Sequence, residues 1–274
     1  MGLSDATPPS RDVWASGEAY EPYVGRWSRL VARDFVAGLG VGAGGAWVEV
    51  GCGTGALSEA ILQIAEPRQL EGVDRSDAYV AYARHRIPDR RATFTVADAT
   101  ALPQPDASAD AVVSGLMLNF VAEPARAVSE MVRVAIPGSG VVGAYVWDYA
   151  DRMELMRYFW DAAIELDPAA QPLDEGRRFP MCRPEPLKSL FRDAGLQAVA
   201  VRAIDVPTRF RDFEDYWSPF IGGQGPAPGY AMSLTEEHRV RLRERLRATL
   251  PAAPSGAIDL VARAWAVEGI RPPV

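Results

Sequence analysis

The chain has 274 residues, enough for one large or two small domains, and its 48% hydrophobic and 24% charged residues are typical of a globular protein. The net charge of −7 disfavours a nucleic-acid duplex as partner, because phosphate binding needs a basic surface. We see no signal-peptide pattern and no apolar run that could cross a bilayer. The two cysteines, Cys52 and Cys182, lack metal-ligand neighbours, so we expect no metal site, no structural disulfide and a cytoplasmic location.

The first predicted element is a helix that follows a polar tail. Residues 1–12 are polar and contain Pro8 and Pro9, which predicts a loose tail. Residues 20–36 place aromatic and arginine side chains ahead of apolar positions at helical spacing. We expect this helix to pack on a sheet and to end near the glycine-rich stretch 38–45. Two roles stay open for Tyr20, Tyr23 and Trp27: they cover the sheet edge, or they close over a bound ligand.

A glycine-rich turn at residues 51–55 separates a predicted buried strand, 46–50, from an amphipathic helix that runs from Ala56 to Ile64. Glycines allow a tight turn and the close approach of a ligand, and the N–H groups at the helix start face that ligand. Strand, turn and helix therefore predict a nucleotide-binding unit. Gly51-x-Gly53-x-x-Ala56 also fits the dinucleotide pattern of NAD enzymes, so the turn alone leaves the ligand open.

Acidic residues follow the next two predicted strands. Residues 69–73 predict the second strand, and Asp74 at its tip is placed to accept both hydroxyls of an adenosine ribose. A helix is expected to start at Asp77. The alternating, β-branched residues 92–96 predict the third strand, which leads into Asp98. NAD enzymes share the first carboxylate, and Asp98 could instead serve only to form a turn.

Two further strands complete this half of the chain. Residues 110–114 predict the fourth strand. A helix is expected to open at Pro124, because proline is favoured at the first helical position. Pro137 and Gly138 then turn the chain into a fifth strand over residues 141–147.

The complete set resembles the motifs of class I S-adenosylmethionine (SAM)-dependent methyltransferases, most closely the small-molecule branch called type 11 or UbiE-like. The resemblance covers about residues 14–147 and rests on Glu49-x-Gly51-x-Gly53-x-Gly55, Asp74, Asp98 between two alanines, Asp110-Ala-Val-Val and Pro137-Gly138, in that order. It implies an α/β fold: a Rossmann-like, seven-stranded, mostly parallel sheet with helices on both faces and an antiparallel last strand.

The resemblance also implies SAM as the cofactor, S-adenosylhomocysteine as its product, and a role for each matching residue. The glycine turn would hold the methionine part of SAM, Asp74 the ribose, and Asp98 with Ala99 the adenine. The implied cofactor-binding residues are Tyr23, Arg29, Glu49, Gly51, Cys52, Gly53, Gly55, Asp74, Arg75, Asp98, Ala99 and Met117. Asn119 and Trp147 are expected to contact the acceptor.

The second half predicts an insertion between the last two strands. We expect a helix over residues 153–164 capped by Asp151, a helix over 185–194 ended by Gly195, a strand over 197–206 and a last strand within 256–267. Residues 13–206 and 255–274 would then form the SAM-binding domain, and residues 207–254 a cap with a helix that begins after Thr235. Three aromatic residues of the cap are expected to contact the acceptor, or else to build the cap's own core: Phe213, Trp217 and Phe220.

We therefore expect methyl transfer from SAM to an O, N or C of a small apolar or aromatic acceptor. This reaction mainly requires alignment and exclusion of water, and the candidates for a base are Asp148, Tyr149 and His238. We expect no membrane insertion, and a monomer or a homodimer. Two alternatives stay open. One is a non-catalytic SAM-binding sensor or partner protein. The other is an NAD-dependent oxidoreductase, although the sole lysine, Lys188, has no Tyr-x-x-x-Lys pattern.

Overall fold

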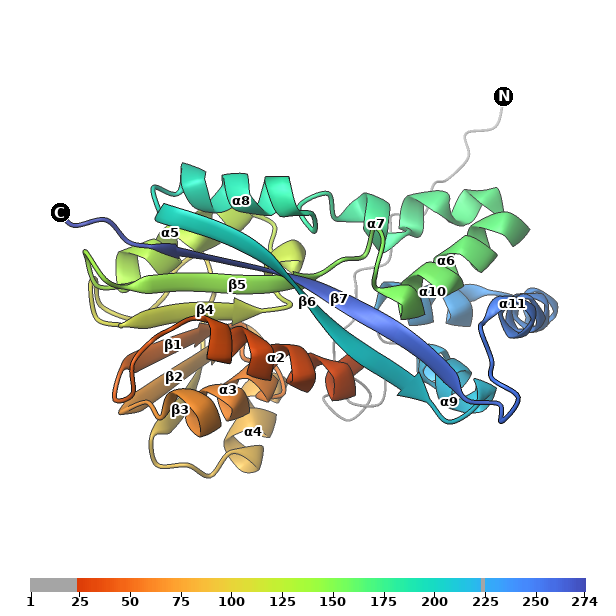
Figure 1. Cartoon of the computed structure of the whole chain (residues 1–274), viewed down its shortest axis with the longest axis horizontal. Helices are drawn as coiled ribbons and strands as arrows, with labels where there is room; N and C mark the ends of the chain where they lie inside the picture. Colours follow the sequence, from red (N-terminus) through yellow and green to blue (C-terminus); the bar gives the residue numbers. More distant parts are fainter. Residues whose placement is uncertain (1–23, 223–224) are drawn as a thin grey trace.

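The computed structural model describes residues 24–222 and 225–274, and Figure 1 shows the arrangement. Seven strands form one sheet in the order β3-β2-β1-β4-β5-β7-β6. The strands are β1 (Ala46–Val50), β2 (Gln69–Asp74), β3 (Ala92–Val96), β4 (Ala111–Gly115), β5 (Val141–Trp147), β6 (Gln197–Phe210) and β7 (Ile258–Ile270). Strands β1 to β5 pair in parallel, and β7 lies antiparallel between β5 and β6. The expected sheet, with its antiparallel last strand, is confirmed.

Helices cover both faces of this sheet, as Figure 1 shows. On one face lie α2 (Arg26–Gly38), α3 (Ala56–Ala60), its π-helical continuation η2 (Ile61–Ala65) and α4 (Asp77–Arg86). On the other lie α5 (Pro124–Val134) and α8 (Pro184–Asp193). Every residue of the central strands β1 and β5 is buried, because both faces are covered.

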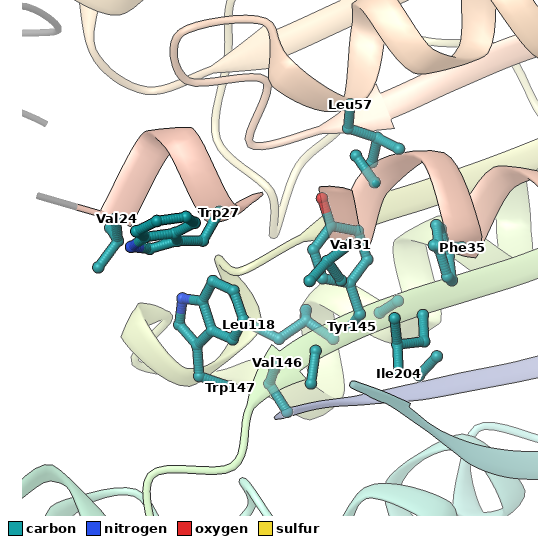
Figure 2. Close-up of a cluster of buried hydrophobic side chains, with 14 of the residues drawn as sticks. Val24, Trp27, Val31, Phe35, Leu57, Leu118, Tyr145, Val146, Trp147 and Ile204 are labelled. Carbon is teal, nitrogen blue, oxygen red and sulfur yellow. The ribbon is translucent and has the colours of Figure 1, made fainter. Parts of the chain in front are cut away.

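Helix α2 packs on the sheet as expected, through the apolar cluster in Figure 2. Phe35 lies against Tyr145 of β5, with ring centroids 4.9 Å apart. Trp27 meets Phe210 of β6 edge to face at 5.6 Å. The predicted tail, 1–12, together with Tyr20 and Tyr23, lies outside the described residues.

Strands β6 and β7 have 14 and 13 residues, whereas the other five have five to seven. They extend past the rest of the sheet as a two-stranded ribbon, whose far end carries the cap (Figure 1). The cap elements are α9 (Phe213–Trp217), η5 (Ser218–Gly222), α10 (Pro226–Ser233) and α11 (Glu236–Thr249). Helix α6 (Glu154–Leu166), which precedes β6, packs against α10 and α11. The segment assigned to the cap therefore includes the last four residues of β6 and shares its core with α6.

Helix ends test the capping predictions directly. The Thr235 side chain accepts a hydrogen bond from the His238 N–H at 3.3 Å, which confirms it as the cap of α11. Gly195 has φ +86° just past α8, as a helix-ending glycine requires. The predicted Asp151 cap is wrong: α6 starts after Met153, whose side chain makes no capping bond. Helix α4 begins at Asp77 as expected, and the Ser76 side chain before it accepts the Tyr79 N–H at 3.4 Å as the cap.

Three short helices connect the remaining elements. η3 (Leu118–Phe120) follows β4 directly. η4 (Pro168–Leu173) and α7 (Glu175–Arg178) lie between α6 and α8. They bring the segment around Phe179 to the carboxyl end of the sheet, where its ring contacts Phe120 and Tyr149.

Candidate active site

A cavity of about 440 Å³ lies at the carboxyl ends of the parallel strands. Each of β1 to β5 contributes lining residues from its end, among them Gly51, Asp74, Asp98, Met117 and Tyr149. Ligands bind at this edge of open α/β sheets because the loops there diverge to either face. One cavity therefore brings together residues that lie almost a hundred positions apart in the sequence.

The glycine turn forms the floor of the cavity. Gly51, Gly53 and Gly55 have φ of 79°, 50° and 85°, in the left-handed region that glycine adopts at little cost. A Cβ on Gly51 would lie 2.5 Å from Cγ of Met117, so this glycine also lets the two loops meet. The Gly53 N–H donates to Oδ2 of Asp74 at 3.0 Å, which ties the turn to the end of β2.

Glu49 lines the cavity although its side chain is buried in β1. Its carboxyl group accepts a hydrogen bond from the Ser58 hydroxyl of α3. Burial raises the pKa of Glu49 to about 8, and the nearby Asp74 carboxylate adds to the rise while the Ser58 bond opposes it. Glu49 is therefore mostly protonated at pH 7, and a cation placed in the cavity would favour its ionised form.

Asp74 and Asp98 offer acceptors at the ends of β2 and β3. Asp74 accepts the N–H of Gly53 on one oxygen and that of Ser76 on the other, at 3.0 and 2.9 Å. Burial raises the Asp74 pKa, and these bonds oppose the rise. Asp98 accepts the N–H and the hydroxyl of Thr100, both on Oδ1, at 2.8 and 2.7 Å. These bonds lower its pKa, so Asp98 is charged at pH 7 and its Oδ2 can accept a ligand donor.

The opposite end of the cavity is apolar and aromatic. Met117 and Phe120 follow β4, and Trp147 and Tyr149 lie at the end of β5. Sequence reasoning missed Phe120, although it stands three positions after Met117, which the resemblance named. It also missed Val24 and Tyr145, for which the sequence carries no separate signal.

Most of the predicted cofactor residues share this cavity. It is lined by Glu49, Gly51, Cys52, Gly53, Asp74, Arg75, Asp98, Ala99 and Met117. Gly55 lies beside it as the residue before α3, and Arg29 forms an ion pair with Glu59 at 3.4 Å. Tyr23 lies outside the described residues. Burial raises the pKa of the Cys52 thiol, which therefore contributes an uncharged wall.

Some of the residues predicted to contact the acceptor or to act as a base line the cavity, and others lie outside it. Trp147 and Tyr149 line the cavity, whereas Asp148 and Asn119 are buried outside its lining. The main-chain oxygen of Asp148 accepts the Met153 N–H at 2.9 Å, and burial raises the pKa of its carboxyl group. Tyr149 is thus the base candidate that reaches the cavity.

The cap residues among the predictions lie away from the cavity. Phe213 stacks on Trp217 at 6.5 Å, and Phe220 stacks on Phe159 of α6 at 4.5 Å. His238 is exposed on α11. Among the described residues of 207–254, none lines the cavity, so these rings build the core between cap and α6.

The chain is similar in sequence to known methyltransferases. A family model described as a methyltransferase domain matches residues 48–142. A demethylmenaquinone methyltransferase of Roseiflexus sp. (strain RS-1) is 30% identical over 171 residues, which cover 57% of this chain and 70% of that protein. One of Renibacterium salmoninarum is 37% identical over 119 residues, 43% of this chain and 47% of that protein. The chain thus spans about half the length of some relatives.

Solved structures agree in fold. The phosphoethanolamine N-methyltransferase 2 of Haemonchus contortus, in complex with phosphomonomethylethanolamine and S-adenosylhomocysteine, superimposes with a TM-score of 0.57 at 16% identity. The match covers 93% of this chain and 56% of that one. The YcgJ protein of Bacillus subtilis gives a TM-score of 0.55 at 15% identity, over 91% of this chain and 100% of that one.

Within 24–222 and 225–274, no three His, Cys, Asp or Glu side chains are grouped as metal ligands. No described helix is both long and apolar enough to span a membrane.

The sheet order, the cavity at its carboxyl edge and the matched relatives agree: the chain belongs to the class I SAM-dependent methyltransferase family.

Proposed function

We propose that the chain transfers a methyl group from SAM to a small apolar or aromatic acceptor. One observation carries the proposal: a single cavity joins an acidic, glycine-lined end to an aromatic end. The first end suits a cationic nucleoside and the second an apolar acceptor, and both open into the same space.

The acidic end fits SAM residue by residue. Asp74 has acceptor capacity beyond its two main-chain bonds, which suits a ribose diol, and Oδ2 of Asp98 suits an amino group of adenine. Gly51 and Gly53 carry no side chains, and this leaves room in the cavity for the methionine part of SAM. Glu49 and Asp74 place acidic groups where a positively charged ligand would be stabilised.

SAM supplies a methyl group that is already activated by its sulfonium. The chain's own task is then to align the acceptor and to keep water away. Trp147 and Tyr149, both buried, line the aromatic end. If an acceptor must lose a proton, Tyr149 is the base candidate, because it lines the cavity and the other two predicted candidates, Asp148 and His238, do not.

The names of the relatives point to a class of acceptor for a first screen. Those named demethylmenaquinone methyltransferases suggest reduced naphthoquinones, which are flat and mostly apolar. We include phenols and aromatic amines to separate transfer to oxygen, nitrogen and carbon.

The test combines transfer and binding. We expect label from methyl-tritiated SAM to appear in at least one acceptor, and Asp98→Ala to weaken SAM binding about tenfold or more, since a hydrogen bond to a charged group is worth roughly 1.5–3 kcal/mol. Asp77→Ala, an exposed aspartate at the start of α4, is the matched control and should bind as the wild type does. SAM binding without transfer to any acceptor would favour the non-catalytic alternative. Unchanged affinity in Asp98→Ala would refute the site assignment.

A further inference from the structure

The aromatic end of the cavity has a second layer. Phe120, after β4, and Tyr149, after β5, line the cavity, whereas Phe179 does not. The Phe179 ring nevertheless contacts both: its centroid lies 5.1 Å from that of Phe120, at 77°, and 5.7 Å from that of Tyr149, at 48°. Phe179 therefore supports two wall residues that come from neighbouring strands.

The segment that carries Phe179 is tied to the end of β5 by partly buried polar contacts. Asp174, just before α7, accepts hydrogen bonds from both terminal nitrogens of Arg157, at 2.7 and 3.1 Å, and from the Gly176 N–H at 2.9 Å. The same guanidinium donates to the main-chain oxygen of Tyr149 at 3.0 Å. The bidentate Arg157–Asp174 ion pair has a fixed geometry, and it holds α7 against Tyr149.

Gly176 shows how closely the two segments approach. A Cβ at this position would lie 2.8 Å from the main-chain oxygen of Tyr149 and 3.0 Å from an Arg157 nitrogen. Both are groups of the polar contact just described. Phe179 thus stands at the end of a short helix whose distance from the cavity wall is set by close packing.

We propose that Phe120 and Tyr149 bind the acceptor as a planar ring, and that Phe179 is the residue that positions them; the three are here called the aromatic wall. This inference rests on the proposed function and narrows its acceptor to compounds with an aromatic ring. Rings attract each other edge to face or offset, and a saturated ring of equal size gains only contact area. The aromatic wall therefore distinguishes planar from puckered ligands. The cap rings play no part in this choice, because they lie outside the cavity lining.

The test uses two probes with the same carbon skeleton, 2-naphthol and decahydro-2-naphthol. Each is titrated by calorimetry into the full chain saturated with S-adenosylhomocysteine. We expect the wild type to bind 2-naphthol about tenfold more tightly than the saturated alcohol. Equal affinities, or no binding of 2-naphthol, would overturn the proposal.

Variants separate positioning from general damage. Phe179→Leu keeps an apolar side chain without a ring, and we expect it to lower the 2-naphthol preference about fivefold, whereas Phe179→Tyr should retain it. Both should bind S-adenosylhomocysteine like the wild type. A merely structural role would weaken both probes equally and leave their ratio unchanged, which would overturn the proposal.

Phe213→Leu is the matched control. Phe213 is also half-buried, contacts a tyrosine and lies beneath an arginine, Arg247, at 4.4 Å, but it stands outside the cavity lining. Its substitution should leave the probe ratio unchanged, and an equal loss in Phe213→Leu and Phe179→Leu would refute the assignment to the wall. The proposed function is judged separately: failure of the wild type to bind S-adenosylhomocysteine contradicts it, whatever the probe ratio.

Discussion

Substitution of Glu49 by glutamine tests the electrostatics of the cavity through the stability of the fold. The side chain is buried, and burial raises its pKa from the ordinary 4.5 to about 8. Glutamine has the same shape, can still accept from Ser58 and does not ionise. Glu49→Gln therefore removes the titration with little change in packing.

The sign follows from proton linkage. Between pH 4.5 and about 8 the folded chain holds a proton on Glu49 that the unfolded chain has lost, so the free energy of unfolding falls as pH rises through this range. Each pH unit is worth about 1.4 kcal/mol, which gives a total of about 3–5 kcal/mol. The loss begins near pH 4.5 and is complete just above pH 8.

Urea denaturation at several pH values between 4.5 and 8.5 measures this effect. We expect the stability of Glu49→Gln relative to the wild type to increase by about 3–5 kcal/mol across the range. Glu237→Gln, an exposed glutamate of α11, should follow the wild-type curve at every pH. A difference between Glu49→Gln and the wild type that stays constant with pH would refute the reasoning.

Two further predictions concern the glycine turn and the partly buried Arg157–Asp174 ion pair. Gly51→Ala should destabilise the fold by about 1–3 kcal/mol and abolish measurable SAM binding, because φ is +79° and the new methyl group meets Met117; calorimetry that shows wild-type affinity would contradict this. Arg157→Ala should lower the free energy of unfolding in urea by about 3 kcal/mol, because it leaves Asp174 buried without its partner. A loss below about 1 kcal/mol would show that the pair is not needed to hold α7.

The sheet and the cofactor end could be predicted because their determinants are local. Apolar runs of strand length, each followed by glycine or aspartate, indicate where parallel strands end. Parallel pairing then brings Gly51, Asp74 and Asp98 to one edge without further information. The same logic predicted that Trp147 would lie there.

The aromatic end could not be predicted in the same way, because it depends on contacts between distant segments. Phe179 contacts Phe120 from a segment that the Arg157–Asp174 pair ties to the end of β5, and neither Arg157 nor Asp174 is marked by spacing or periodicity. Phe220 stacks on Phe159 of α6, because the β6–β7 ribbon carries the cap beyond the sheet edge. The many aromatic residues of this segment predicted aromatic contacts, but the sequence did not indicate that α6, rather than the acceptor, would supply the contacting ring.

Calorimetric titration with SAM, S-adenosylhomocysteine and NAD tests the central claim most directly. The acidic, glycine-lined end of the cavity predicts that the first two bind at one site per chain and that NAD does not. Binding of NAD alone would contradict the account from the glycine turn onward. Failure of all three ligands to bind would contradict the assignment of the cavity as a SAM site.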